Sequence, residues 1–441
     1  MKLNKRKSKK FRRGSILAFV VVIGLCLALL GMGMLQMGFG SRLNSHISVS
    51  VITAREAADA GIAKALYSMN AAFPTPDWAP TGSGTLPNSN ASYSYEITVP
   101  PYAEPRGAYF DHYEIKSIGT SDRDQRIIYT VTGIRNFLDY GLIVTNTIDL
   151  KSDTLLDGYD TRLGPYTEFP DTTNSHAYIR IGTTSIAENA IWLHQDTWIT
   201  GDVLTGIGGD VYEVIQETPT GGSITGPWYS LPEPWSFDPI IIPDAVYIPS
   251  GSIGNSTPWD GTGSYRVPAV VTGEKQYFQF DNIDVPTGQS LIFLGPVDII
   301  ITGNLELDNA ATLYVGEPFP DLEHPAYPLS SLTIYLYGDL LVRNGGNINN
   351  LSRIPLNFQL YGVGPPYQDW DIYNSGDYYG IYYGPNANIR TYATAEFYGS
   401  ISGHDFLLFN GGQLHYDRAL ADLTAYDTGF GIDSWWEQSG L

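Results

Sequence analysis

Two histidine-containing motifs are the parts of this sequence that could do chemistry. Gly403-His404-Asp405 places an imidazole beside a carboxylate. Glycoside hydrolysis needs two carboxyl groups several ångströms apart, one acting as acid and one as base. The Asn-x-Asp and Asp-Asp signatures expected on consecutive rungs upstream, which would supply the pair, are missing, and Asn146-Thr147-Ile148-Asp149 does not fit the spacing. We therefore interpret His404 as a corner residue of a β-domain that bonds to backbone, and we predict that the protein is not an enzyme.

The second motif is His415-Tyr416-Asp417, near the end of the chain. These residues have the composition of a catalytic triad fragment, but the sequence has no Gly-x-Ser-x-Gly nucleophile motif. We interpret the motif as structural, closing the last turn of a β-domain through hydrogen bonds.

Three aspartates, Asp153, Asp157 and Asp160, offer oxygen ligands of the kind that calcium prefers. Neither an EF-hand loop nor a glycine-rich nonapeptide repeat accompanies them, and Asp157-Gly158 is typical of a turn. We predict no metal and no cofactor. The tyrosines of Asp377–Tyr383 suit stacking on sugar rings or a partner, but in a β-rich protein we expect them to cover the flank of a sheet.

The apolar run Ser15–Phe39 has no charge and no proline, and as a helix it is long enough to cross a bilayer. The basic leader, residues 1–14, carries eight Lys or Arg and no acid, which holds that end in the cytoplasm. A cleaved secretory signal is the alternative, but its apolar core is shorter. Without the leader the chain has 17 basic against 46 acidic residues, a balance of −29, which argues against nucleic acid as a partner. The single cysteine, Cys26, lies inside the run, so no disulfide forms within the chain.

Residues 41–70 continue with apolar residues every three or four positions, the pattern of one helix face. No proline interrupts residues 15–70, so we predict one continuous helix, with an α-hairpin folded back on its own domain as the alternative. The alanine-rich outer half would let other helices approach closely.

The sequence RRGSILAFVVVIGLCLALLGMGML, followed by AREAADAGIAKAL, resembles the N-terminal module of type IV pilin-like proteins, in particular the PilX-type module of fimbrial assembly proteins. The resemblance covers roughly residues 10–70. It implies cleavage between Gly14 and Ser15 by a prepilin peptidase and a helix that packs in a filament core. Major pilins carry Glu at the fifth mature position, where this chain has Phe19. That departure favours a minor or tip role, or simple anchoring.

Residues 71–136 are predicted to be a small head. A proline-rich loop precedes three segments that alternate apolar and polar residues: 92–99, 112–119 and 126–134. A long helix followed by a short antiparallel sheet is also what the pilin resemblance implies.

Residues 137–420 read as short strands joined by Gly, Asn, Asp and Pro corners. Leu332–Val342 repeats Val297–Leu307 at an offset of 35 residues, and Trp198–Leu204 has the same theme. These features predict a right-handed parallel β-helix or β-solenoid, with a β-sandwich as the alternative. The segments around 155–160, 381–388, 397–402 and 411–420 resemble an uncharacterised bacterial family with a β-helix-like domain and a "HYD" finish. Residues 421–441, which include Trp435-Trp436, are predicted to be a cap or tail.

Together these features predict a mostly β protein with one long N-terminal helix. We expect a pilin-like structural or adhesive component of a type IV pilus or type II secretion-like assembly, held in a bacterial inner membrane by a single pass. Its expected partners are other pilin-like subunits, the membrane and a prepilin peptidase. The alternative is a membrane-anchored β-helix that binds or cleaves surface polysaccharide.

Overall fold

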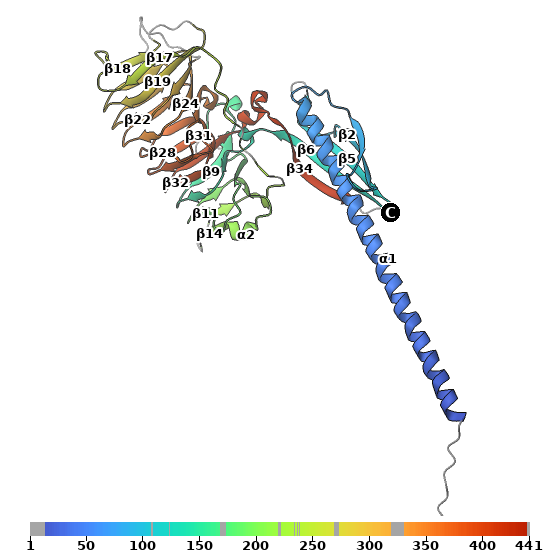
Figure 1. Ribbon diagram of the computed structural model, residues 1–441. Coiled ribbons are helices and arrows are strands. Elements are labelled where there is room, and N and C mark those ends of the chain that lie inside the picture. Colours follow the sequence, from blue (N-terminus) through green and yellow to red (C-terminus); the bar gives the residue numbers. More distant parts are fainter. Residues whose placement is uncertain are drawn as a thin grey trace, which may run out of the picture. The chain divides into compact units, whose positions relative to one another are not determined.

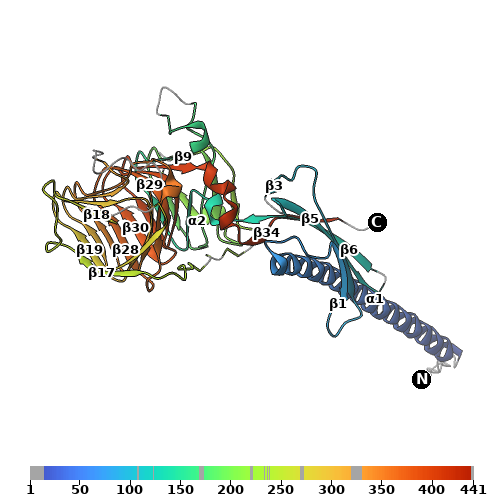
Figure 2. The ribbon, with the colours of Figure 1, turned by 90° about the horizontal axis from the view of Figure 1, so that it is seen from above.

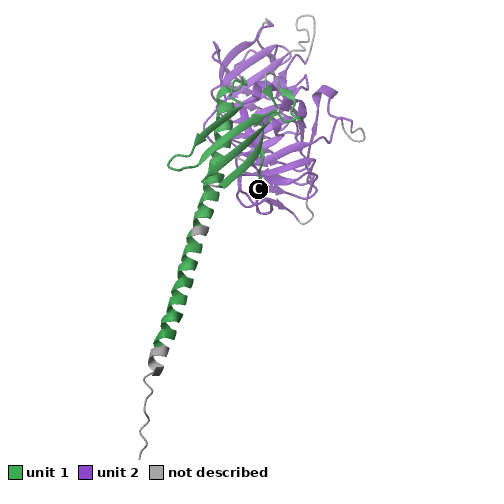
Figure 3. Cartoon of the chain, turned by 90° about the vertical axis from the view of Figure 1, so that its right-hand side faces the viewer, with its two compact units in different colours: residues 1–133, 433–441 green, residues 134–432 purple. Residues whose placement is uncertain are grey.

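The computed structural model describes residues 14–106, 109–122, 124–167, 173–218, 222–232, 234–235, 237, 239–268, 273–318 and 330–438. The chain divides into two compact units, shown in different colours in Figure 3. The first unit combines residues 1–133 with residues 433–441, and the second consists of residues 134–432. The second unit is thus an insertion in the sequence of the first.

A single helix, α1 (Gly14–Ala72), forms the N-terminal part of the first unit (Figure 1). Its 59 residues span about 88 Å at about 1.5 Å per residue. It runs without a break through Gly40, as the absence of proline predicted. Within the described chain it is the one helix long and apolar enough to cross a membrane, and its apolar window is not buried by any other part of the protein.

Five strands form the head sheet in the order β1-β2-β5-β6-β34. The bounds are β1 Thr81–Thr85, β2 Ser92–Thr98, β5 His112–Ser121, β6 Asp124–Arg135 and β34 Gly429–Gln438. Strands β1, β2, β5 and β6 pair antiparallel, and β3 (Pro105–Arg106) with β4 (Tyr109–Phe110) forms a separate short hairpin. The three predicted strands are therefore confirmed as β2, β5 and β6.

Small residues bring α1 against its own sheet. Ala54, Ala57, Ala58 and Ala65 have no exposed surface. A Cβ atom on Gly119 of β5 would lie 2.0 Å from the Ala54 carbonyl oxygen, so only glycine permits this approach. The alanine-rich half of the helix, which we expected to receive other helices, is thus used on this face within the protein.

The C-terminal residues differ from the expected cap or tail. Gly429–Gln438 form β34, the outer strand of the head sheet beside β6. Trp436 stacks on Tyr129 of β6, with ring centroids 5.4 Å apart and planes at 6°. The sequence signal was missed because β34 pairs with a strand about 300 residues earlier, and local patterning does not report such distant partners.

The second unit is built from short strands that pair in parallel, one stacked on the next (Figures 1 and 2). Its first part contains β7 Leu142–Val144, β8 Ile148–Leu150, β9 Leu155–Tyr159, β10 Ile179–Thr183, β11 Ile191–Leu193, β12 Trp198–Ile199, β13 Gly201–Thr205, α2 Val211–Val214, β14 Ile215–Glu217, β15 Ser223–Ile224 and β16 Trp228–Ser230. Three short 3-10 helices also belong to the unit's entry and exit: η1 Phe137–Asp139, η4 Arg418–Asp422 and η5 Thr424–Tyr426. A further one, η2 (Thr161–Leu163), follows β9.

The second part of the unit contains β17 Ile248–Ile253, β18 Ser264–Val267, β19 Gln276–Val285, β20 Ser290–Phe293, β21 Pro296–Ile301, β22 Leu305–Leu307, β23 Thr312–Val315, β24 Ser331–Leu336, β25 Leu340–Val342, β26 Asn347–Asn350, η3 Pro355–Asn357, β27 Phe358–Gly362, β28 Gln368–Ile372, β29 Asp377–Tyr383, β30 Ala387–Thr391, β31 Glu396–Gly403, β32 Asp405–Leu408 and β33 Gln413–Asp417. Residues separated by one repeat face each other, so that Val297 pairs with Leu332 and Leu307 with Val342. The 35-residue offset is therefore confirmed as the register of β21–β22 on β24–β25. Parallel pairing favours a solenoid-like stack over the antiparallel sandwich.

The third copy of the theme, Trp198–Leu204, stacks elsewhere. Its strands β12 and β13 pair with β9, β15, β10 and β16, and not with β21 or β24. It shares a glycine followed by Asp or Asn with the other two copies, but it does not share their place in the stack. The sequence similarity of Trp198–Leu204 to the other two segments therefore does not show which rungs are neighbours in the stack.

The order of the stack differs from the order of the chain. We call each set of consecutive strands, such as β7-β8-β9, a rung. The first rung lies between the second rung, β10-β11-β12, and the last rung, β31-β32-β33. The chain thus enters the stack in its interior, builds outward to β16, restarts at β17 and returns to meet its own beginning. We call the contact of the first and last rungs the seam.

Residues 231–247, which we call the strap, connect the two ends of this stack. Ten successive parallel pairings separate β16 from β17. At about 4.8 Å per pairing this distance is about 48 Å, and 17 extended residues reach about 58 Å. The strap packs as it crosses, with Trp235 against Tyr140 and Phe237 against Tyr383.

The core of the second unit consists of inward aliphatic columns with a few large rings. Trp370, Tyr378, Phe358 and Phe397 have 1% exposure or less. In the predicted tyrosine cluster, Tyr378 and Tyr382 point into this core, whereas Tyr379 and Tyr383 pack on its outside. The tyrosines of Asp377–Tyr383 are therefore buried and do not form an exposed sugar platform.

Candidate functional site

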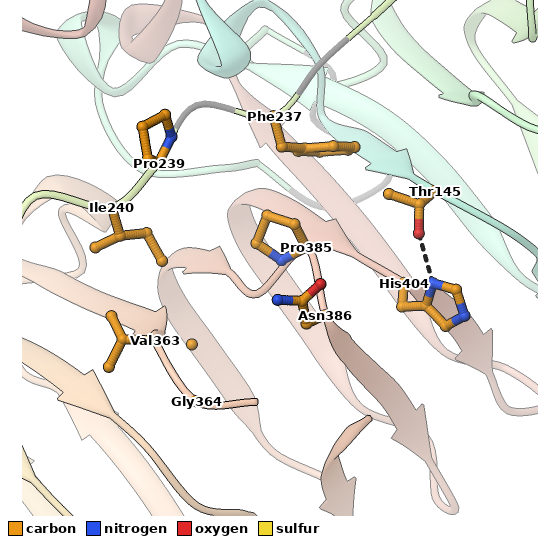
Figure 4. A pocket seen from close by; sticks show the side chains of 10 residues that line it. Thr145, Phe237, Pro239, Ile240, Val363, Gly364, Pro385, Asn386 and His404 are labelled. Carbon is orange, nitrogen blue, oxygen red and sulfur yellow. Dashed lines mark hydrogen bonds between the residues drawn. The ribbon is translucent and has the colours of Figure 1, made fainter. Parts of the chain in front are cut away.

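A pocket of about 450 Å³ lies where the strap passes over the stack (Figure 4). One wall consists of strap residues Phe237, Pro239 and Ile240. The other wall comes from the corners that follow β7, β27, β29 and β31, and it contains Thr145, Gly362, Val363, Gly364, Pro385, Asn386 and His404. Stacked rungs place these corners in one column, which is why residues 259 positions apart meet here.

His404 lies at a corner, between β31 and β32, as predicted, and it also lines this pocket, but its ring bonds to a side-chain hydroxyl and not to backbone. Its Nδ1 atom is 2.5 Å from the Thr145 hydroxyl, and its backbone N–H donates to the Ala387 carbonyl at 2.7 Å. The Nε2 atom is 3.9 Å from Asp405, too far for a hydrogen bond. Asp405 instead accepts bonds from the Thr147 backbone N–H at 2.9 Å and from the Asn146 amide at 2.8 Å. The imidazole is therefore tied to a neighbouring corner and is not oriented by a carboxylate.

The chemistry available in the pocket is that of a binding site. Asn386 and His404 offer polar groups, while proline, isoleucine, valine and phenylalanine provide apolar walls. The described lining residues include no Asp or Glu, so the two carboxyl groups that glycoside hydrolysis requires do not face each other here.

An Asn and Asp column runs along the same corner of the stack. In three successive contacts, a side-chain oxygen accepts a hydrogen bond from the backbone N–H group of the next residue in the column. Asn282 accepts from the Asn304 N–H at 2.9 Å, Asn304 accepts from the Asp339 N–H at 3.0 Å, and Asp339 accepts from the Asp369 N–H at 2.9 Å. The Asn388 amide then donates to Asp369 at 3.0 Å. Asn282, Asn304 and Asp339 thus each satisfy a corner N–H group of the next rung, which explains why these corners recur as Asn or Asp in the sequence.

The His415-Tyr416-Asp417 motif lies in β33, at the seam. His415 Nδ1 is 2.6 Å from Asp157 Oδ1, and neither side chain has exposed surface. The Tyr416 hydroxyl donates to the Leu138 carbonyl at 2.5 Å. Asp417 accepts from the Thr161 hydroxyl at 2.8 Å and from its backbone N–H at 3.1 Å. All three residues of the motif therefore join the last rung to the beginning of the unit.

Asp157 is the centre of this buried polar group. Its second oxygen accepts from the Tyr166 hydroxyl at 3.0 Å and from the His176 backbone N–H at 2.9 Å. The rings of Tyr166 and His415 lie 3.9 Å apart. Burial raises the pKa of Asp417, and the hydrogen bonds from Thr161 and Ala419 offset part of that rise.

The candidate calcium ligands do not converge. Asp153 lies in a turn with φ of 60°, Asp157 is bonded to His415, and Asp160 caps η2 and pairs with Arg162. Among the residues that the structure describes, no group of three or more His, Cys, Asp or Glu side chains is arranged to hold a metal ion.

The predicted processing site begins the described chain. Gly14 and Ser15 are the first residues of α1, and the predicted span Ser15–Phe39 lies within that helix. The leader residues 1–13 and the Phe19 side chain lie outside the described residues, so cleavage at Gly14 stays a prediction.

Sequence reasoning missed a polar clamp where the chain enters and leaves the second unit. Asn136 is fully buried, and its amide donates to Asp427 at 3.1 Å and to the Leu423 carbonyl at 3.2 Å. The Thr428 backbone N–H donates to the Arg135 carbonyl at 2.9 Å. The partners are 287 to 293 residues apart, and nothing in the local pattern around Asn136 indicates them.

Part of the second unit matches the model of a known domain family. Residues 269–423 match the domain of unknown function DUF7305, which spans the region from just before β19 through η4. Among solved structures, the chain is similar to the competence-associated pilin ComZ from Thermus thermophilus, with 11% identity and a TM-score of 0.25 over 88% of this chain and 97% of that one. A TM-score this low carries no conclusion about fold or function. No curated protein matches the chain.

Proposed function

We propose that this protein is a pilin-like, membrane-anchored structural or adhesive component that displays its second unit outside the cell. One observation carries the proposal. Helix α1 is continuous from Gly14 to Ala72, its outer half packs on a small antiparallel sheet, and its apolar half is bare. A helix divided in this way can sit in a bilayer and later pack beside other helices without any change to the head.

The finer proposal is a minor subunit of a type IV pilus or type II secretion-like assembly. Phe19 in place of Glu removes the carboxylate that, in the family this chain resembles, pairs with the neighbouring subunit's new amino terminus. A subunit without that carboxylate suits a low-copy or tip position. The expected partners are other pilin-like subunits through α1, the inner membrane with the N-terminus in the cytoplasm, and a prepilin peptidase. Nucleic acid is not an expected partner.

We also propose that the parallel stack is a right-handed β-helix and that its role is display, without catalysis. Hydrogen-bonded corners and aliphatic columns make such a stack stiff without disulfides. The alternative is that the second unit binds or cleaves surface polysaccharide. The pocket under the strap favours the binding half of this alternative, because its described lining offers hydrogen-bonding groups and no pair of carboxyl groups.

Mass spectrometry of the mature N-terminus tests the proposal. In cells with a prepilin peptidase, we expect a chain that begins at Ser15, and in cells without it a chain that begins at Met1. A Gly14→Val variant should stay uncleaved, whereas Gly24→Val, inside the helix with nothing within 4 Å of a new Cβ, should be cleaved normally. Recovery of intact Met1 from peptidase-competent cells would refute the pilin assignment and leave a plain anchor.

A further inference from the structure

The last strand of the head is the last strand of the chain. It reaches the head sheet only after the chain has passed through the rungs of the second unit, because 293 positions separate Arg135, which ends β6, from Thr428, which precedes β34. In the head it lies beside β6, Trp436 stacks on Tyr129, and ion pairs reach it: Asp433 lies 3.4 Å from His112, and Glu437 lies 3.3 Å from Arg126 and 3.8 Å from Arg55. All of these contacts join residues of β34 to residues about 300 or more positions earlier, so the strand must first be brought to the head from far along the chain.

The second unit ends in a geometry that fixes where β34 begins. The Thr428 N–H bonds to the Arg135 carbonyl, and buried Asn136 bonds to Asp427 and to Leu423. Arg135 is the last residue of β6, and Thr428 directly precedes β34. The two strands that pair in the head are therefore also joined at one end by bonds that involve no residue of the head.

The bonds of the seam lie next to this clamp in the chain and bring its two sides together. Tyr416 bonds to Leu138, and Asp417 bonds to Thr161, when the last rung stacks on the first. The Tyr416 bond brings the end of β33 beside the segment after β6, and the Asp417 bond holds that end on the segment after β9. Without the seam, the residues of the clamp are separated by nearly 300 positions of chain.

We propose that β34 is a closing strand, and that the head sheet acquires it only when the last rung of the second unit has joined the first. Closing an unstructured loop becomes less probable as the three-halves power of its length. Reducing the loop from 293 residues to roughly ten raises the probability of β34 meeting β6 by about a hundredfold. The head is thereby a reporter of whether the second unit is complete. This inference does not depend on the proposed function, since it concerns folding alone.

The test uses hydrogen exchange of the full chain in detergent, read on peptides from β6 and β34, with β5 as internal reference. In His415→Ala, which breaks the seam, we expect β6 and β34 amides to exchange at least tenfold faster, although no head residue has changed. Asn136→Ala, which removes the side-chain bonds of the clamp and changes no residue of the seam, should do the same. Leu313→Ala is the matched control, because Leu313 is fully buried in β23, away from the seam, and should leave the head unchanged.

A second arm removes the strand itself. A chain ending at Thr428 should keep the protection of the second unit and lose that of the β6 amides that do not bond to β5, and adding a peptide of residues 429–441 should restore them. Undiminished β6 and β34 protection in both His415→Ala and Asn136→Ala would overturn the proposal. If His415→Ala unfolds the whole second unit, the test still decides. A head in which β6 and β34 stay protected without that unit would overturn the proposal, because such a head does not need the seam.

Discussion

His415 and Asp157 form a fully buried pair, 2.6 Å apart, although 258 residues separate them in the chain. One residue belongs to the last rung and the other to the first. The pair is therefore the polar centre of a contact between two rungs that are not consecutive in the chain, so only non-covalent interactions hold them together. Its loss should separate the two rungs more readily than the loss of any interaction within a continuous part of the stack.

Asp157→Ala should destabilise the second unit by about 3 kcal/mol, because it removes a buried carboxylate and leaves His415, Tyr166 and the His176 N–H without that partner. Denaturant unfolding followed through the second unit measures the change. The double variant with His415→Ala should cost clearly less than the sum of the two single variants. Arg162→Ala, at an ion pair whose arginine is 55% exposed, is the control and should cost less than about 1 kcal/mol. Additive losses at Asp157 and His415 would contradict a coupled pair.

Gly119→Val should detach the outer half of α1 from the head. A Cβ at Gly119 would lie 2.0 Å from the Ala54 carbonyl and 2.4 Å from the Ala58 nitrogen, both backbone atoms that cannot rotate away. We expect a loss of at least about 3 kcal/mol, measured as the unfolding of the first unit. Gly84→Val is a milder control, because the new Cβ meets only the mobile end of the Tyr93 ring. Equal stability of the Gly119 and Gly84 variants would mean that the helix is not seated as described.

The head should lose stability as the pH rises toward 9. The hydrogen bond to Asp433, partly opposed by burial and assisted by Asp111, raises the pKa of His112 from 6.5 to about 9. A raised pKa means that the folded head favours the protonated imidazole, so its contribution is complete below pH 6.5 and is lost as the pH rises through about 9. His112→Gln should therefore lower the melting temperature of the head at pH 6 and have little effect at pH 10. An NMR titration of His112 that gives an ordinary pKa would contradict this account.

The sequence contained the local elements of this fold. The uninterrupted apolar pattern predicted α1, alternation predicted β2, β5 and β6, and the 35-residue offset predicted the register of Val297 on Leu332. Each of these signals depends on neighbours along the chain or on one repeat length. Such signals are strong because helix and strand periodicities follow directly from backbone geometry.

The order of the stack and the role of β34 were not readable in the same way. Asp157 and His415 carry no mark that assigns them to each other, and the corner Asp417 would satisfy its hydrogen bonds equally well with any suitable hydroxyl. The choice of Thr161 depends on which rungs are neighbours, and that depends on where the strap carries the chain. The motif 415–417 could be interpreted as structural from its residues, but its partners required the structure.

Arg266 and Glu317 provide the last prediction, at the outer end of the stack. The Arg266 Nε atom donates to Glu317 Oε2 at 2.8 Å and Nη2 to Oε1 at 3.2 Å, while Nη1 donates to Asp260 at 2.7 Å. The Glu317 side chain has no exposed surface, whereas Asp260 is 38% exposed.

Arg266→Leu should lower the stability of the second unit by about 3 kcal/mol, because the buried carboxylate loses both guanidinium bonds. Arg266→Lys should recover only part of this loss, because a lysine cannot make the paired contact. Asp260→Asn, which removes only the exposed partner, should cost about 1 kcal/mol or less. Calorimetry of the three variants should therefore rank Leu below Lys below Asn in stability, and a destabilisation by Asp260→Asn as large as that of Arg266→Leu would show that the exposed pair, not the buried one, holds this end of the stack.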